Sequence, residues 1–153
     1  MTSSATSRPA SPESGDATSP STELAAERPL VAILADDLIW TTRLVAAATE
    51  AGAQPIRLRS IDALVGSGDP PSAASPFVIV DLTARAYDGI EAVRLARAGG
   101  AAVLAVGQHD DLAGRKAALE AGATRVLAYR KLFEDGPGVI RRWLEAADAS
   151  RST

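Results

Sequence analysis

The stretch that decides the fold is residues 30–37, Leu-Val-Ala-Ile-Leu-Ala-Asp-Asp, in which six apolar residues are followed by Asp36 and Asp37. An uninterrupted apolar run of this length, closed by acids, is typical of a parallel strand that is buried on both faces. A second run, residues 77–80, ends in the same way at Asp81. Open α/β proteins bind ligands outside the carboxyl ends of their strands. The three acids therefore predict one acidic site at that edge of a sheet.

Outward from this stretch, apolar runs alternate with amphipathic stretches over residues 29–147, which is the pattern of βαβ units and a parallel sheet. We expect an α/β domain with a five-stranded parallel sheet, doubly wound and flavodoxin-like. Pro137 suits the first turn of the last helix, where its missing N–H is not needed. The expected strands are 30–35, 55–59, 77–81, 101–106 and 124–128, and the expected helices are 39–51, 61–65, 88–98, 110–121 and 137–147.

Three segments lack this alternation. Residues 1–28 are rich in Ser, Thr, Pro and Ala and contain no aromatic residue, so burial cannot offset the entropy of ordering them. We expect a disordered tail there and a short tail at 148–153. Residues 66–71, Gly-Ser-Gly-Asp-Pro-Pro, predict a loop.

Composition limits the classes of function. The chain has 153 residues, 46% of them hydrophobic, which suits one domain with an ordinary core. The net charge of −3 and the scattered basic residues argue against a nucleic-acid surface. The absence of Cys and the single His109 exclude thiolate sites and His clusters. No apolar stretch reaches the roughly 20 residues that span a bilayer. We expect a cytoplasmic protein that binds neither nucleic acid nor membrane.

Two further motifs point to a family. Residues 81–89 match the pattern Asp-Leu-x-Met-Pro-x-x-Asp-Gly at both ends, although not at its central Met-Pro. Residues 118–123, Ala-Leu-Glu-Ala-Gly-Ala, resemble the stretch that precedes the fifth strand in the same family. Residues 29–147 thus resemble the receiver domain of bacterial response regulators. This resemblance implies a receiver-like fold.

The resemblance also implies a chemistry for the acids. Asp36, Asp37 and Asp81 would hold Mg²⁺, which prefers carboxylate oxygens and water, and Asp81 would be the phosphoacceptor. The chain would then be no enzyme beyond slow, Mg²⁺-dependent self-phosphorylation and dephosphorylation. A competing interpretation is that one acid of the Asp36–Asp37 pair only caps the helix that follows, because Asp is favoured at helix starts.

The chain departs from the family at two positions that normally complete and read the site. Gly107 stands where the family has a hydroxyl residue, and Tyr129 stands where it has Lys. Possible substitutes for the missing groups are His109, Arg130 and Lys131, the last only if the fifth strand continues that far. An alternative interpretation of Tyr129 is a packing aromatic. We therefore expect an atypical receiver, or pseudo-receiver, with an impaired switch.

The expected function is a stand-alone signalling module of a two-component or phosphorelay type. It would act through protein partners, such as a histidine kinase or a downstream effector, and could form a homodimer. The alternative is a small cofactor- or ligand-binding α/β protein or enzyme on the same fold. Its weakness is the turn at residues 35–39, which contains no glycine and so no phosphate-binding loop. A purely structural assembly domain is the third interpretation.

Overall fold

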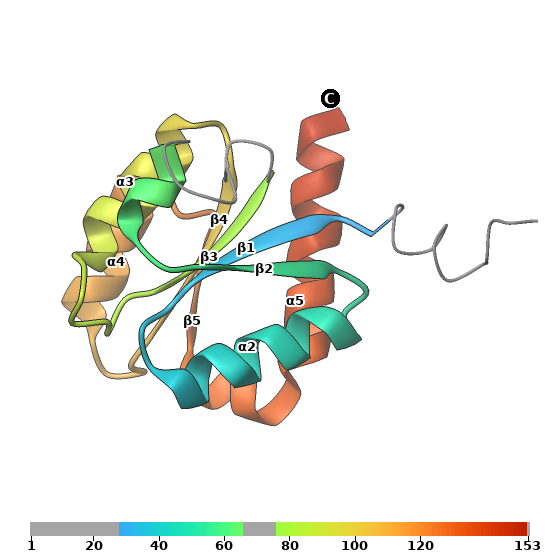
Figure 1. Cartoon of the computed structure of the whole chain (residues 1–153), viewed down its shortest axis with the longest axis horizontal. Helices are drawn as coiled ribbons and strands as arrows, with labels where there is room; N and C mark the ends of the chain where they lie inside the picture. Colours follow the sequence, from blue (N-terminus) through green and yellow to red (C-terminus); the bar gives the residue numbers. More distant parts are fainter. Residues whose placement is uncertain (1–27, 66–75, 153) are drawn as a thin grey trace, which may run out of the picture.

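The computed structural model describes residues 28–65 and 76–152 and places five parallel strands in one sheet (Figure 1). The strand order is β2-β1-β3-β4-β5, the doubly wound order in which the chain reverses direction across the sheet between β1 and β3. The predicted fold class is thereby confirmed. The elements are β1 (Leu30–Leu34), α2 (Leu38–Glu50), β2 (Gln54–Leu58), the 3-10 helix η1 (Ile61–Val65), β3 (Phe77–Asp81), α3 (Gly89–Ala98), β4 (Ala102–Gly107), α4 (Leu112–Ala121), β5 (Arg125–Ala128) and α5 (Tyr129–Ser152).

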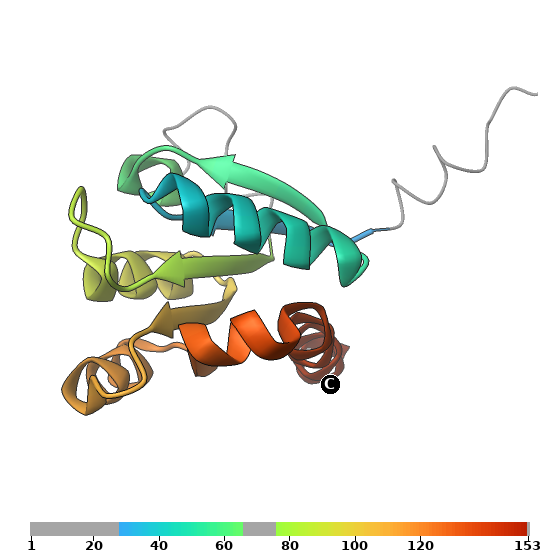
Figure 2. The ribbon, with the colours of Figure 1, turned by 90° about the horizontal axis from the view of Figure 1, so that it is seen from below.

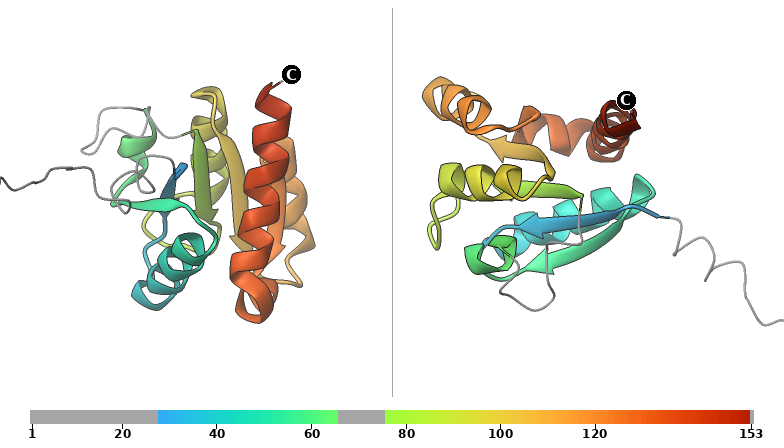
Figure 3. Two further views of the ribbon diagram at one scale, coloured as in Figure 1. Left: turned by 90° about the vertical axis from the view of Figure 1, so that its right-hand side faces the viewer. Right: turned by 90° about the horizontal axis from the view of Figure 1, so that it is seen from above.

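The core has two layers because successive residues of a strand face opposite sides of the sheet. Val31 and Ile33 pack with the buried side of α2 and α5, whereas Ala32 and Leu34 pack with α3, α4 and η1. Figure 3 shows these two pairs of α-helices on opposite faces of the sheet. Burial on both faces is the reason why β1, β3 and β4 have uninterrupted apolar sequences.

The connection between β2 and β3 contains a short helix at the predicted place, but it is of a different type. The brief helix predicted at 61–65 is a single 3-10 helix, so the described residues contain four α-helices and not five. Five residues offer too few apolar positions to cover the sheet as an α-helix would. Ala63 and Leu64 of η1 are buried in the same core layer as α3, which contacts η1.

The last helix also differs from the prediction. α5 starts at Tyr129, before the expected start at 137, and it continues through residues 148–152, where we expected a tail. Asp135 has non-helical backbone angles (φ −155°, ψ 59°) and divides α5 into two pieces. Figure 2 shows the two pieces running in different directions. Pro137 lies just after this break, in the first turn of the second piece, as its missing N–H requires.

Two predictions fall outside the described residues, namely the disordered tail at 1–28, apart from Arg28 itself, and the loop at 66–71. Across residues 28–65 and 76–152, no helix combines the length and the apolar character needed to cross a bilayer.

Candidate functional site

Asp81 is the last residue of β3 and is completely buried, with 0% of its surface exposed. Phe77 and Ile79 of the same strand face α2 and α5, so strand alternation turns Asp81 toward these two helices as well. A carboxylate at this depth needs compensation for the water that it has lost. Its partners therefore decide what the site can do.

Only one oxygen of Asp81 is compensated. Its Oδ1 accepts hydrogen bonds from the Thr83 backbone N–H (2.9 Å), from the Thr83 hydroxyl (2.8 Å) and from the Tyr129 hydroxyl. Its Oδ2 is buried and has no partner among the described residues. An unsatisfied buried acceptor costs about 1–3 kcal/mol, and more when it is charged. The site thus contains one saturated oxygen and one oxygen that would gain from water or a cation.

Tyr129 covers Asp81. It follows β5 directly, and alternation from Leu127 points its ring to the α2 and α5 face, where it is 8% exposed. Its hydroxyl also lies 2.8 Å from the Thr83 hydroxyl, and its ring centroid lies 3.9 Å from that of Trp40 on α2. Burial, and next the hydrogen bond to Asp81, raise the pKa of the Tyr129 phenol. Tyr129 therefore keeps its proton and acts as a neutral donor.

Asp36 anchors the loop between β3 and α3. Its Oδ2 accepts the backbone N–H groups of Arg85 (2.8 Å) and Ala86 (3.0 Å). These contacts connect the end of β1 to a loop that is 49 and 50 residues away in sequence. The Asp36 carboxylate is thus used by the protein backbone, at a position where the sequence predicted a metal ligand.

Tyr87 fastens the same loop from inside. Its hydroxyl donates to the backbone carbonyls of Leu34 (2.8 Å) and Asp81 (2.9 Å), the last residues of two adjacent strands. Burial raises the pKa of the Tyr87 phenol, and the nearby carboxylates of Asp81 and Asp36 raise it further. Tyr87 is therefore protonated and holds β1, β3 and the loop together.

Asp37 caps α2. Its backbone is extended (φ −83°, ψ 123°), and its side chain accepts the backbone N–H of Trp40 at 2.9 Å. This is the geometry of an N-cap, which satisfies one of the free N–H groups in the first helical turn. The competing interpretation of the acid pair, helix capping, is confirmed for Asp37.

The three acids follow adjacent strands but do not form a metal-binding cluster in this conformation. Within residues 28–65 and 76–152, no group of three or more His, Asp or Glu side chains is placed to hold a metal ion. One oxygen of Asp36 and one of Asp37 are directed to backbone N–H groups, and Asp81 is buried. The assignment of Asp36, Asp37 and Asp81 as Mg²⁺ ligands stays a prediction.

Gly107 ends β4 at the position where the family has a hydroxyl residue. A Cβ atom at Gly107 would lie 3.4 Å from Cδ1 of Leu82, which is ordinary van der Waals contact. The side chain of Leu82 thus lies over this position, and the hydroxyl function is absent. His109, two residues later, is exposed in the loop after β4.

Neither predicted substitute cation contacts Asp81, whose donors are Thr83 and Tyr129. β5 ends at Ala128, so the chain is already helical at Arg130 and Lys131, and both side chains are exposed. Arg130 lies 3.8 Å from Glu134 in an exposed ion pair. The strand extension that Lys131 required does not occur.

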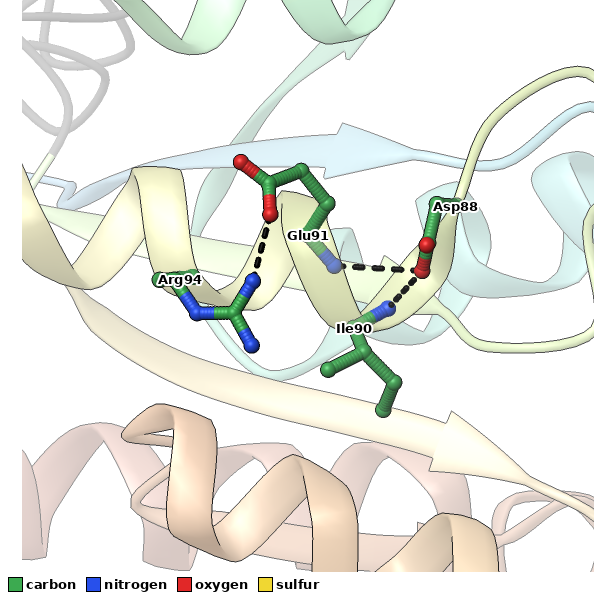
Figure 4. A network of polar contacts seen from close by, with 4 residues as sticks. All are labelled: Asp88, Ile90, Glu91 and Arg94. Atoms are coloured by element: carbon green, nitrogen blue, oxygen red, sulfur yellow. Dashed lines mark hydrogen bonds and ion pairs between the residues drawn. The ribbon is translucent and has the colours of Figure 1, made fainter.

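The Asp88-Gly89 end of the family-like motif has a structural role (Figure 4). Asp88 caps α3 by accepting the backbone N–H groups of Ile90 (3.0 Å) and Glu91 (3.2 Å), and Glu91 pairs with Arg94 one turn later. A Cβ atom at Gly89 would lie only 2.8 Å from Cα of Leu82, so the close approach of two backbones requires glycine.

The sequence analysis assigned no functional role to Thr83, Tyr87 or Trp40. Thr83 had a detectable signal, because an Asp often accepts hydrogen bonds from the residue two positions later. Tyr87 and Trp40 had none, since their contacts to Leu34 and Tyr129 join separate elements.

Comparisons with known proteins identify the fold. No protein-family model matches the chain, and no curated protein matches its sequence. Among solved structures, the BeF3-activated DrrB receiver domain is 17% identical, with 77% of this chain and 98% of that chain covered and a TM-score of 0.64. FixJ-N is 23% identical (79% and 94% covered, TM-score 0.65). The signal receiver domain of a modulated diguanylate cyclase from Desulfovibrio desulfuricans G20 is 17% identical (82% and 98% covered, TM-score 0.67). The chain has the receiver fold.

Proposed function

We propose that this chain is a signalling module of the receiver type that acts through contacts with protein partners, and that its acceptor position, Asp81, is closed to phosphate. The observation that carries the proposal is the complete burial of Asp81 beneath Tyr129, the residue at the family's lysine position. The receiver fold supports the signalling class. A histidine kinase or a downstream effector is the expected kind of partner, and the cytoplasm is the expected location.

The closed state disfavours phosphoryl transfer for two physical reasons. First, attack on phosphorus needs a carboxylate oxygen with a free path, whereas Oδ1 of Asp81 holds three hydrogen bonds and Oδ2 is buried. Second, phosphoryl transfer depends on positive groups that neutralise the charge of the moving phosphoryl group. Tyr129 supplies only a neutral hydroxyl, and Gly107 supplies no donor side chain. Losing one preorganised donor costs about 10²–10³ in rate in other enzymes.

Mg²⁺ binding would require rearrangement around Asp81, which would have to become accessible. Asp36 would have to offer the oxygen that does not accept the backbone N–H groups of Arg85 and Ala86. The module is accordingly proposed to signal in its metal-free form. It has no catalytic turnover of its own in this proposal.

The test is phosphate uptake measured by intact-protein mass spectrometry. The protein is incubated with acetyl phosphate and Mg²⁺, beside its Asp81→Asn variant and a receiver domain that is known to accept phosphate. We expect the reference domain to gain one phosphate and both forms of this protein to gain none. One phosphate on the unmodified protein, lost in Asp81→Asn, would show that the site is open and would overturn the closed-site proposal.

A further inference from the structure

The first piece of α5, residues 129–134, is structurally separate from the rest of the helix. The break at Asp135 interrupts the helix, and the Asp135 side chain caps the second piece by accepting the Gly138 backbone N–H at 3.2 Å. Asp135 also lies 3.6 Å from the guanidinium of Arg142 in that second piece. The long part of α5 therefore begins with its own cap and does not depend on residues 129–134 for its start.

Side-chain rings attach residues 129–134 to α2. The Tyr129 ring packs on Trp40, and the guanidinium of Arg43 lies 5.7 Å from the Trp40 ring centroid and 4.8 Å from that of Phe133. Trp40 thus contacts Tyr129 directly, whereas Phe133 is held through Arg43. Phe133 is 66% exposed, and the groove behind it, of about 190 Å³, lies between α2 and α5. This attachment can be reached from the protein surface.

The closed arrangement leaves a buried acceptor unsatisfied. Tyr129 and Thr83 both donate their hydroxyl groups to Oδ1 of Asp81, and Oδ2 has no partner within residues 28–65 and 76–152. Withdrawal of Tyr129 would remove one hydrogen bond from Asp81 but would let water reach Oδ2. Hydration of Oδ2 would therefore partly offset the free-energy cost of the lost hydrogen bond. The free energies of the closed state, with Tyr129 on Asp81, and of the open state, with Tyr129 withdrawn, are thus brought closer together. Both states can be populated.

We propose that residues 129–134 are a lid over Asp81 and that Trp40 holds this lid closed by packing its ring on that of Tyr129. The lid opens when Tyr129 leaves Asp81, and it does so without unfolding of the second piece of α5. The inference rests on the proposed function, since it describes how the closed acceptor site of that module is regulated.

The test measures the accessibility of Asp81 by carbodiimide coupling of an amine, followed by peptide mapping, which needs neither Mg²⁺ nor phosphate. The exposed carboxylates of Asp36 and Asp88 are internal references. In the unmodified protein we expect Asp81 to react at least about tenfold more slowly than the references, as for a minor open state. Trp40→Ala should bring the Asp81 rate close to that of the references. Ile39→Ala, a neighbouring exposed residue of α2, is the matched control and should change nothing.

Hydrogen exchange supplies the second readout. Amides of residues 130–134 should exchange faster than those of residues 139–147 in the unmodified protein, and Trp40→Ala should accelerate only the first set. If Trp40→Ala fails to fold, Trp40→Leu is used, which keeps apolar volume but removes the ring. The lid is overturned if a folded Trp40 variant leaves the Asp81 rate unchanged, or if both pieces of α5 exchange together. Phosphate uptake by the unmodified protein would overturn the closed-site proposal separately, because the coupling experiment involves no phosphate.

Discussion

Tyr129 donates its hydroxyl to Asp81 across 48 residues of sequence, and this bond connects the end of β3 to the start of α5. A lysine at the same place would supply a full positive charge that could move between the carboxylate and a phosphoryl group. The phenol supplies a fixed, neutral donor whose ring is packed on Trp40. Because of this bond, the conformation at the carboxyl-terminal edge of the sheet does not depend on a bound anion.

Loss of the Tyr129 hydroxyl should destabilise the fold. Tyr129→Phe keeps the ring and removes a hydrogen bond to a buried carboxylate, so we expect the free energy of unfolding to fall by about 1.5–3 kcal/mol. Asp81→Asn keeps an acceptor oxygen and removes the buried charge, so it should cost less than Tyr129→Phe. Urea denaturation of both single variants and the double variant measures these values and their coupling. A Tyr129→Phe variant as stable as the parent would contradict the structural role of the bond.

Stability should fall in alkali because of the tyrosines. Burial raises the pKa of both Tyr129 and Tyr87 above the value of about 10 that tyrosine has in an unfolded chain. The contribution of the two tyrosines to the free energy of unfolding is therefore complete below about pH 10. Above it, the unfolded state loses protons that the folded state keeps, and stability should fall by about 1.4 kcal/mol per pH unit for each tyrosine. These are the two tyrosines of the chain, so ultraviolet difference absorbance reports them directly.

In the same alkaline titration we expect no tyrosinate signal before unfolding begins. Tyr129→Phe should halve the slope of stability against pH, and Tyr87→Phe should do the same. Ionisation of a phenol near pH 10 in the folded protein would show that this phenol is not buried in solution as it is in the structure.

Asp36 should hold the loop between β3 and α3 through its acceptor oxygen, not through its charge. Asp36→Ala frees the N–H groups of Arg85 and Ala86, and their hydrogen exchange should accelerate markedly. Asp36→Asn keeps a carbonyl oxygen that can accept both, so exchange should stay near that of the parent. Heteronuclear spectra of the three proteins provide the comparison. Equal exchange in all three would mean that other contacts hold the loop.

Restoring the two missing donors should restore phosphate uptake. The space over Gly107 accepts a Cβ at ordinary contact distance from Leu82, so Gly107→Ser should fold, and Tyr129→Lys supplies an ammonium group beside Asp81. Because each donor contributes about 10²–10³ in rate in other enzymes, we expect the double variant to react with acetyl phosphate and Mg²⁺ on the order of 10⁴ times faster than the parent or more. Adding Asp81→Asn should abolish uptake. A folded double variant that remains inert would show that other features close the site.

The alternation of apolar runs and amphipathic stretches was enough to predict the sheet and most helix positions. Strands that are buried on both faces need a continuous apolar sequence. Residues 30–34, 77–80 and 102–106 could therefore be recognised as strands from their apolar runs. Helix starts at Asp37 and Asp88 are also local features, because a cap involves residues only two or three positions apart. The break at Asp135 was not predicted. The helical piece before it, residues 129–134, is attached to α2 by ring contacts, and such contacts join elements that are far apart in the sequence.

The sequence by itself determined that Asp36, Asp37 and Asp81 lie at one edge of the sheet, since the pattern of βαβ units makes the strands parallel and so brings their carboxyl ends to the same edge. Only the tertiary structure decided what each acid does there. Asp36 accepts N–H groups 49 and 50 residues away, and Asp81 accepts the hydroxyl of a residue 48 positions away. The physical reason is that a carboxylate takes whichever donors surround it, and the donors of a buried or edge position come from neighbouring elements that only the folded chain brings together.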